Sequence, residues 1–149
     1  PVEPNGRACN CGARGCLEQY ASATGIVKSI VERRKAGTPG SLDTVAAENL
    51  TTHEIAAAAR AGDNQARAAF AEAGERLGQV VAGAVNLLNP DGVVITGGVS
   101  ASFDLMEGAV RKELEDRCFE RSLNKLQLRC GELGDKAGIL GAALLSSND

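Results

Sequence analysis

The sequence contains the stretch Cys9-Asn10-Cys11-Gly12-Ala13-Arg14-Gly15-Cys16-Leu17-Glu18, which is the most specific feature of the chain. Three cysteines lie within eight residues, and two glycines separate the second cysteine from the third. A loop with so few apolar side chains cannot bury its own backbone unless something else holds it in shape. A bound metal ion is the simplest way to stabilise such a loop. Thiolates at Cys9, Cys11 and Cys16 can reach one tetrahedral centre, so the stretch predicts a structural zinc site.

A closed structural zinc site needs a fourth ligand, which this stretch does not supply. The only histidine is His53, in Thr51-Thr52-His53-Glu54 at the start of a predicted helix, where we expect it to be exposed rather than bound to metal. Water, a neighbouring chain or His53 are the alternatives for the fourth position. We expect Cys118 and Cys130, which are far from the stretch in the sequence, to be buried free thiols.

Composition places the chain among ordinary globular proteins. It has 149 residues, 44% of them apolar, which suffices for one domain with a core. Its net charge of −3 offers no basic face for nucleic acid. The sequence contains no uninterrupted apolar run of about 18 residues, so no membrane span is predicted. Five cysteines, three of them clustered, favour a reducing compartment, and we expect the cytoplasm. The chain opens at Pro1 without a methionine, and we expect it to be the C-terminal portion of a longer protein.

Hydrophobic spacing predicts a helical segment over residues 17–88. Within it we expect helices at 17–35, 52–61 and 64–88, with a loop or a short helical turn at 41–50. Gly74, Gly78 and Gly83 reduce helix propensity in the longest helix, so they predict places where another backbone packs closely.

The remaining segment, 92–146, predicts a βαβα arrangement. A β-branched strand at 92–96, of the kind that is buried on both faces of a parallel sheet, precedes a crossover helix at 103–119. An alternating strand at 126–130, nearer an edge, precedes a final helix at 135–145. The fold class is therefore α/β and helix-rich, with a short parallel sheet.

Two glycine turns follow the two predicted strands. Ligands bind outside the carboxyl ends of parallel strands, and at Gly97-Gly98 backbone N–H groups can approach an anionic ligand, helped by the positive end of the following helix. The segment from Gly134 to Gly138 can line the same cleft. The alternative is a tight strand-to-helix turn, because the spacing matches neither a Walker loop nor a dinucleotide fingerprint.

Glu18 lies two residues after the last cysteine of the loop. A carboxylate can accept hydrogen bonds from two sugar hydroxyls at once, and whatever fixes Cys16 also fixes Glu18. The alternative is an exposed glutamate in the first turn of a helix, where the helix dipole favours it.

Residues 9–18, followed by Gln19-Tyr20-Ala21-Ser22, resemble the C-x-C-G-x-x-G-C-x-E signature of the ROK family of bacterial sugar kinases and sugar-responsive repressors. The stretch Val94-Ile95-Thr96-Gly97-Gly98-Val99-Ser100 resembles the second nucleotide-contacting loop of that family. Residues 133–143 resemble its closing segment. The resemblance extends over nearly the whole chain, with its motifs in the family's order.

The resemblance implies the C-terminal part of an actin-like (ribonuclease H-like) ATPase fold. It implies that Cys9, Cys11 and Cys16 bind zinc together with a histidine just upstream of them, which this chain lacks. It also implies that Glu18 contacts sugar hydroxyls and that Gly97 and Gly98 lie against the nucleotide; we add Gly138 to this set. The first phosphate loop and the catalytic aspartate of the family would precede Pro1. We therefore expect residues 1–149 alone to be inactive.

Three functions follow as hypotheses. The first is an ATP- and magnesium-dependent hexose kinase of the glucokinase type, with glucose expected ahead of mannose, fructose, N-acetylglucosamine and N-acetylmannosamine. The second is the sugar-sensing domain of a ROK-type transcriptional repressor, and the third is a zinc-stapled assembly module without catalysis. We also expect a homodimer, formed through helices rich in small residues.

Overall fold

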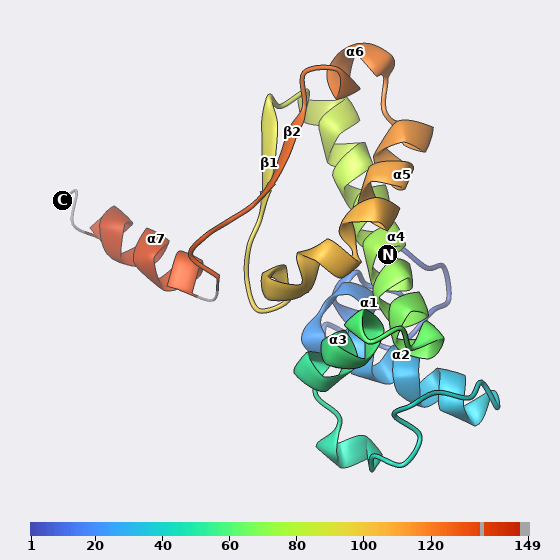
Figure 1. Cartoon of the computed structure of the whole chain (residues 1–149). Helices are drawn as coiled ribbons and strands as arrows, with labels where there is room; N and C mark the ends of the chain where they lie inside the picture. The colour runs from blue at the N-terminus through green and yellow to red at the C-terminus, as the bar shows by residue number, and fades with distance from the viewer. Residues whose placement is uncertain (135, 147–149) are drawn as a thin grey trace.

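The structure is a computed structural model that describes residues 1–134 and 136–146. The elements, in which η marks a 3₁₀ helix, are in order α1 (Glu18–Ala21), α2 (Ala23–Lys35), η1 (Ala47–Asn49), α3 (Thr52–Arg60), α4 (Asn64–Leu88), β1 (Gly92–Ile95), η2 (Ser100–Leu105), α5 (Glu107–Arg117), α6 (Glu120–Leu123), β2 (Gln127–Cys130) and α7 (Lys136–Ser146). Figure 1 shows α4 as the long central helix, with α1, α2 and α3 around its N-terminal part and α5 along its side. Asp135, the first residue of the predicted final helix, lies outside the described residues.

The helix predicted over residues 17–35 is interrupted, so that prediction is wrong at one point. Ser22 has extended dihedral angles, φ −96° and ψ 169°, and its Oγ accepts a hydrogen bond from Gly25 N at 3.0 Å. A serine in this position caps the helix that follows instead of continuing the one before it. The chain therefore forms a separate short helix, α1, that carries Glu18, and then the capped helix α2.

The two other helices predicted in this segment are confirmed, and their first residues explain their bounds. At α3, Glu54 N donates to Thr51 Oγ1 at 3.2 Å and Thr51 N donates to Glu54 Oε2 at 2.9 Å, which is a reciprocal capping box. At α4, Ala66 N donates to the Asp63 carboxylate at 2.7 Å. Helix α4 ends where Asn89 adopts the left-handed region, with φ 48°.

The glycines of α4 mark close packing at two of the three predicted places. A Cβ at Gly74 would lie 2.6 Å from the Met106 carbonyl oxygen, and one at Gly78 would lie 3.0 Å from the Val110 carbonyl oxygen. These two positions let the backbone of α5 approach α4. The prediction is wrong for Gly83, which is exposed and has no described atom within 4 Å of the position that a Cβ would take.

Strands β1 and β2 pair in parallel, with Gly92 opposite Gln127 and Ile95 opposite Cys130. The crossover between them contains η2, α5 and α6, so the predicted helix at 103–119 is shorter than expected and begins at Glu107. The expectation that β1 is buried on both faces is wrong, because Val94 is 62% exposed. The sheet of the described residues has two strands, and the second face of β1 has no helix packed over Val94.

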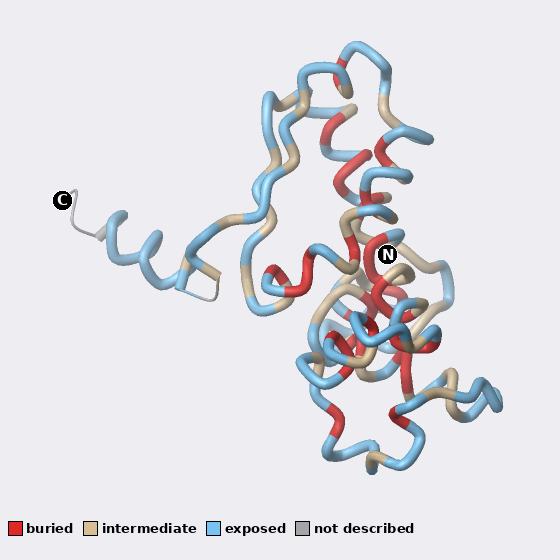
Figure 2. Tube along the Cα trace, viewed as in Figure 1, coloured by how far each residue is buried: buried red, intermediate tan, exposed pale blue. Residues whose placement is uncertain are grey.

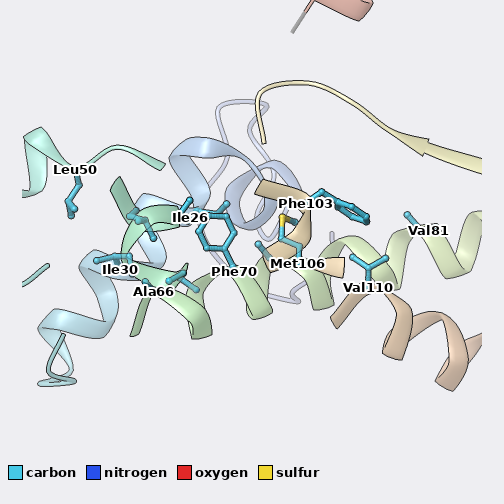
Figure 3. Close-up of a cluster of buried hydrophobic side chains, with 14 of the residues drawn as sticks. Ile26, Ile30, Leu50, Ala66, Phe70, Val81, Phe103, Met106 and Val110 are labelled. Carbon is cyan, nitrogen blue, oxygen red and sulfur yellow. The ribbon is translucent and has the colours of Figure 1, made fainter. Parts of the chain in front are cut away.

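The core lies between the helices rather than on the sheet, as Figure 2 shows in red along α2, α4 and α5. Figure 3 shows Phe70 of α4 among Ile26, Ala66 and Met106, and all four side chains are buried. Burying such side chains removes apolar surface from water, the main favourable term in folding. Ile95 and Val99, which flank the glycine turn, pack against this core.

Helix α7 projects away from the body of the molecule beyond β2 (Figure 1). Its apolar side chains are exposed, with Ile139 at 74% and Leu145 at 78%. No helix in the described part of the chain is long and apolar enough to cross a membrane.

Candidate functional site

The three clustered cysteines come together as predicted. Their sulfur atoms all lie within 4.8 Å of one another, and Cys11 Sγ lies 3.5 Å from Cys16 Sγ. Tetrahedral zinc with Zn–S bonds of about 2.3 Å needs sulfur atoms about 3.8 Å apart, so the donor set and its spacing fit a zinc ion. Among the described residues this is the single group of three or more cysteine, histidine or acidic side chains that could hold a metal ion. His53 is exposed on α3 and is not part of the group, as expected.

A small hairpin holds the cysteines in place. Ala8 and Arg14 form an isolated antiparallel bridge, and Cys9 N donates to Ala13 O at 2.9 Å. Gly15 has φ +69°, and a side chain there would overlap the Glu3 carbonyl oxygen. Only glycine fits a left-handed position against another backbone, so the spacing of the motif follows from this turn.

Hydrogen bonds shift the pKa values of Cys11 and Cys16 in opposite directions. The backbone N–H of Ala13, followed by the Cys16 and Cys9 thiols, lowers the pKa of Cys11 by hydrogen bonding. The hydrogen bonds of Cys16 with Cys11 and Cys9 raise the pKa of Cys16 to about 11. Because metal ligation requires thiolates, binding of a cation at this group releases protons.

The two remaining cysteines are free thiols outside the cluster. Cys118 is half-buried, and burial raises the pKa of its thiol. Cys130 is exposed, so the expectation of a buried thiol is wrong there. It ends β2, a strand of the two-stranded sheet that is exposed over most of its length.

Glu18 is exposed at the start of α1, beside the cysteine loop. Its Oε2 atom lies 3.6 Å from Cys9 Sγ and accepts a hydrogen bond from Gln19 Nε2. The expected coupling between the loop and this carboxylate is therefore a direct contact. The carboxylate remains accessible to a ligand, as a hydrogen-bond acceptor for hydroxyl groups must be.

Arg7 connects the cysteine loop to both helices that follow it. Its guanidinium donates to Gln19 O at 2.5 Å, to Ser29 Oγ at 2.9 Å and, through Nη2, to Glu32 Oε2 at 2.7 Å. It also lies over the Tyr20 ring, 4.4 Å from the centroid, and its side chain is 11% exposed. These contacts of Arg7 were not predicted from the sequence, because no spacing rule links an arginine before the first cysteine to groups on α1 and α2.

The turn Gly97-Gly98 follows β1, as predicted. Gly97 has φ +97°, a conformation that favours glycine, and its carbonyl oxygen accepts from Ser100 Oγ at 2.6 Å. The turn leads into η2, and α5 begins only at Glu107. The expectation that the positive end of the following α-helix lies at the turn is therefore wrong, because Ser100 N donates to the Gly97 carbonyl oxygen and a 3₁₀ helix intervenes.

The two glycine loops meet at the ends of the strands. Thr96 Oγ1 donates to Gly134 O at 3.1 Å, and Gly131 N donates to Ile95 O at 2.7 Å. Gly138 lies further along, exposed in the first turn of α7, with no described atom within 4 Å of a Cβ placed there. Gly97 and Gly134 likewise have no described atom within 4 Å of a Cβ placed there, whereas Gly131 is closely packed against Val94 and Ile95.

A cavity of about 180 Å³ joins the glycine turn to α1. Its lining includes Thr96, Gly98 and Ser100 of the turn and Ala21, the last residue of α1. Leu77, Phe103 and Met106 contribute the apolar walls. The helix that carries Glu18 and the turn after β1 therefore border one space, although about 80 residues separate them in the sequence.

Similarity to known proteins agrees with this arrangement. A family model described as the ROK family matches residues 1–149. The chain is 35% identical over 152 residues to a glucokinase of Thermotoga maritima, covering 95% of this chain and 45% of that protein. A ROK family glucokinase from Streptomyces griseus, solved in complex with glucose and AMPPNP, matches with a TM-score of 0.76 and 31% identity, covering 97% of this chain and 48% of that one.

A ROK family transcriptional regulator, a homologue of the E. coli MLC protein, matches with a TM-score of 0.84 and 31% identity, covering 98% of this chain and 36% of that one. The chain spans about half the length of the glucokinases it matches, with 45% and 44% of two of them covered. These likenesses confirm the predicted fold class, a helix-rich part of the actin-like ATPase fold with a short parallel sheet. The chain belongs to the ROK family.

Proposed function

We propose that this chain is part of an ATP-dependent hexose kinase of the glucokinase type. The observation that carries the proposal is that α1, the helix that begins at Glu18, and the turn at Gly98 border one cavity, which Ala21 lines and Glu18 does not. A kinase must bring a sugar-binding carboxylate and a nucleotide loop close together. The similarity to glucokinases, one of them solved with glucose and AMPPNP, supports the same function.

In this proposal Glu18 accepts hydrogen bonds from hydroxyl groups of the hexose, and the backbone at Gly97, Gly98 and Gly138 lies against ATP, which carries magnesium. A sugar oxygen forms a bond to the γ-phosphorus as the bond to the bridging oxygen breaks, ADP leaves, and the hydroxyl proton passes to a base. The family resemblance implies an aspartate for that base, and no residue of this chain is assigned to it.

Cys9, Cys11 and Cys16 would hold a structural zinc ion, which would cross-link the loop without taking part in the transfer. The contact of Cys9 Sγ with Glu18 at 3.6 Å supports a role for the loop in holding the sugar-binding carboxylate. A reducing compartment such as the cytoplasm suits the clustered thiols. A homodimer remains a prediction, as does the preference for glucose over mannose, fructose and the N-acetylated amino sugars.

The second candidate is the sugar-sensing domain of a transcriptional repressor. The observation that favours it is the match to a ROK family transcriptional regulator, whose TM-score is 0.84. A sensor needs the sugar site and the metal loop but no phosphoryl transfer. An assembly module, the third hypothesis, needs neither sugar nor nucleotide.

The test is hexose-dependent ADP formation by the full-length protein, assayed with glucose, mannose, fructose, N-acetylglucosamine and N-acetylmannosamine. Glu18→Gln should lower the turnover of the preferred sugar at subsaturating concentration by about 10-fold or more, because it removes a charged hydrogen-bond acceptor. Glu115→Gln, at an exposed position of α5, is the matched control and should leave turnover unchanged. Absence of turnover with every sugar would reject the kinase, and sugar-dependent DNA binding without turnover would favour the repressor.

A further inference from the structure

Gln19 is a buried amide between two exposed charges. It is 3% exposed, whereas its hydrogen-bond partners Glu18 and Lys28 both reach solvent. Gln19 Nε2 donates to Glu18 Oε2, and Lys28 Nζ donates to Gln19 Oε1 at 2.5 Å. A buried amide is costly unless it is hydrogen-bonded, and here both ends of the amide are used.

The chemistry of the two partners fixes which way the amide points. A lysine ammonium only donates hydrogen bonds and an ionised carboxylate only accepts them. The amide oxygen must therefore face Lys28, and the amide nitrogen must face Glu18. Reversing the amide would set its NH₂ group against the ammonium and its oxygen against the carboxylate, so the chain Lys28–Gln19–Glu18 has one favourable arrangement.

The backbone of Gln19 is held as firmly as its side chain. Arg7 Nη1 donates to Gln19 O at 2.5 Å and to Gly25 O at 3.2 Å, which joins α1 to the first turn of α2. The same guanidinium is paired with Glu32. The amide thus acts from a fixed position and not from a mobile loop.

Only one oxygen of Glu18 is used in this way. Oε2 faces Gln19 and Cys9, and Oε1 receives no hydrogen bond from the described residues. A carboxylate that is held through one oxygen has its plane fixed, and its second oxygen is presented to ligand hydroxyls at a lower entropic cost.

We propose that Gln19 is a positioning residue, oriented by Lys28, that presents the Glu18 carboxylate to the hydroxyl groups of the sugar. The proposal rests on the proposed role of Glu18 in sugar binding. It gives a role in sugar binding to Gln19 and Lys28, which lie outside the cysteine motif. It also predicts that the charge on Lys28 influences sugar binding without contact between Lys28 and the sugar.

The test uses the full-length protein and measures KM for the preferred hexose, KM for ATP and kcat. Gln19→Met keeps the size of the side chain but removes the donor, and it should raise KM for the hexose about 10-fold, the usual effect of losing a hydrogen bond to a charged group. Lys28→Met should raise it about threefold, because the amide loses its fixed orientation. The double variant should resemble Gln19→Met alone, since Lys28 acts through Gln19. KM for ATP should not change.

Gln19→Glu separates positioning from simple packing. It keeps the size of the side chain and the partner of Lys28, but it places a like charge against Glu18 in place of a donor. It should therefore raise KM for the hexose more than Gln19→Met does, whereas a residue that only fills space would show the opposite order. Lys112→Met, which removes an exposed lysine paired with Asp116 on α5, is the matched control and should leave all three constants unchanged.

The outcomes separate the two proposals. If the wild-type protein turns over a hexose and Glu18→Gln raises its KM, but Lys28→Met and Gln19→Met leave it unchanged, the positioning role is wrong and the kinase stands. If the wild-type protein turns over no sugar, the proposed function fails and the positioning role fails with it. If Gln19→Met does not fold, Lys28→Met, at an exposed position, decides: an unchanged KM for the hexose then overturns the proposal.

Discussion

The cysteine loop with α1 and α2 differs from the glycine turn with α7 in how each is held. In the first region side chains from distant positions converge: Arg7 reaches α1 and α2 at the same time, and its guanidinium lies against Tyr20. In the second region the loops meet through single hydrogen bonds, such as that from Thr96 to Gly134. Its apolar side chains Val94 and Ile139 stay exposed.

This difference shows which part of the proposed site is held in place by side-chain contacts among the described residues. The hydrogen bonds of Glu18 and Arg7 are made within the first 32 residues of the sequence, and α4 also contacts this region through Arg76, which pairs with Glu3 and lies over the Tyr20 ring. The position of Glu18 should therefore respond most to changes in the loop and in the α4 side chains that contact it. The glycine turn has an open backbone whose partners among the described residues are few, so changes there should alter ligand binding more than stability.

The largest effect is expected at the metal. Cys11→Ser should reduce bound zinc in the dialysed full-length protein from about one ion per chain to nearly none, because structural zinc binds through thiolates with an apparent free energy of about 10–16 kcal/mol. Zinc is measured by mass spectrometry of the metal content. Cys118→Ser is the matched control, since Cys118 lies outside the cluster and its pKa is raised by burial. Full retention of zinc by Cys11→Ser would show that the cysteine cluster does not bind the metal.

The next effect is expected at Arg7. Arg7→Met should lower the free energy of unfolding by about 3 kcal/mol, because it leaves Gln19 O and Ser29 Oγ without their donor in a nearly buried site. Urea unfolding of the full-length protein measures this. Arg111→Met removes an exposed i,i+4 pair with Glu107 and should cost less than about 0.5 kcal/mol. Equal losses for the two variants would mean that the first region is no more tightly held than the surface.

A smaller effect is expected at the glycine turn. Gly97→Ala places a side chain at φ +97° in open space, which costs about 1–2 kcal/mol of local strain. It should raise KM for ATP several times more than KM for the hexose, a division that steady-state kinetics of the full-length protein can measure. Gly108→Ala, in α5 with no described atom near its Cβ position, should change neither constant. A rise in KM for the hexose alone would show that the turn contacts the sugar and not ATP.

The smallest effect concerns Asp63, which caps α4, the helix that α1, α2 and η2 contact. Burial opposes ionisation of Asp63, but hydrogen bonds from Ala66 N and Ser41 outweigh it and lower the pKa of the carboxyl group. The lowered pKa contributes stability that is fully present above the unfolded value of about 3.9 and is lost as the pH falls through the folded value. Asp63→Asn should therefore cost about 1 kcal/mol or less at pH 7, and the cost should shrink as the pH falls through the folded pKa of Asp63. A difference in urea midpoint that persists in acid would contradict this.

The sequence predicts best the features that depend on neighbouring residues. The caps at Thr51 and Asp63 locate α3 and α4, and the spacing of Cys9, Cys11 and Cys16 locates the thiol cluster, because each feature forms within a few residues. The interruption at Ser22 has the same local cause, a serine cap, but an apolar pattern that continues into α2 hides it.

Features that depend on distant partners could not be predicted. A strand rich in valine indicates burial on both faces, but Val94 is exposed because burial depends on what packs over the sheet and not on the strand itself. Gln19 and Lys28 are nine positions apart and on different helices, and only the break at Ser22 lets them meet. The cluster of the three thiols and the glycine turn after β1 were therefore predictable, but the polar contacts around Glu18 were not.

The most direct test of the account is a crystal structure of the full-length protein with glucose and a non-hydrolysable ATP analogue. We predict a sugar hydroxyl within hydrogen-bond distance of Glu18 Oε1, Gln19 Nε2 still donating to Oε2, and the nucleotide against Gly97 and Gly98. Glucose bound away from α1, or a nucleotide that does not contact the glycine turn, would contradict the central claim that these two elements border one active site.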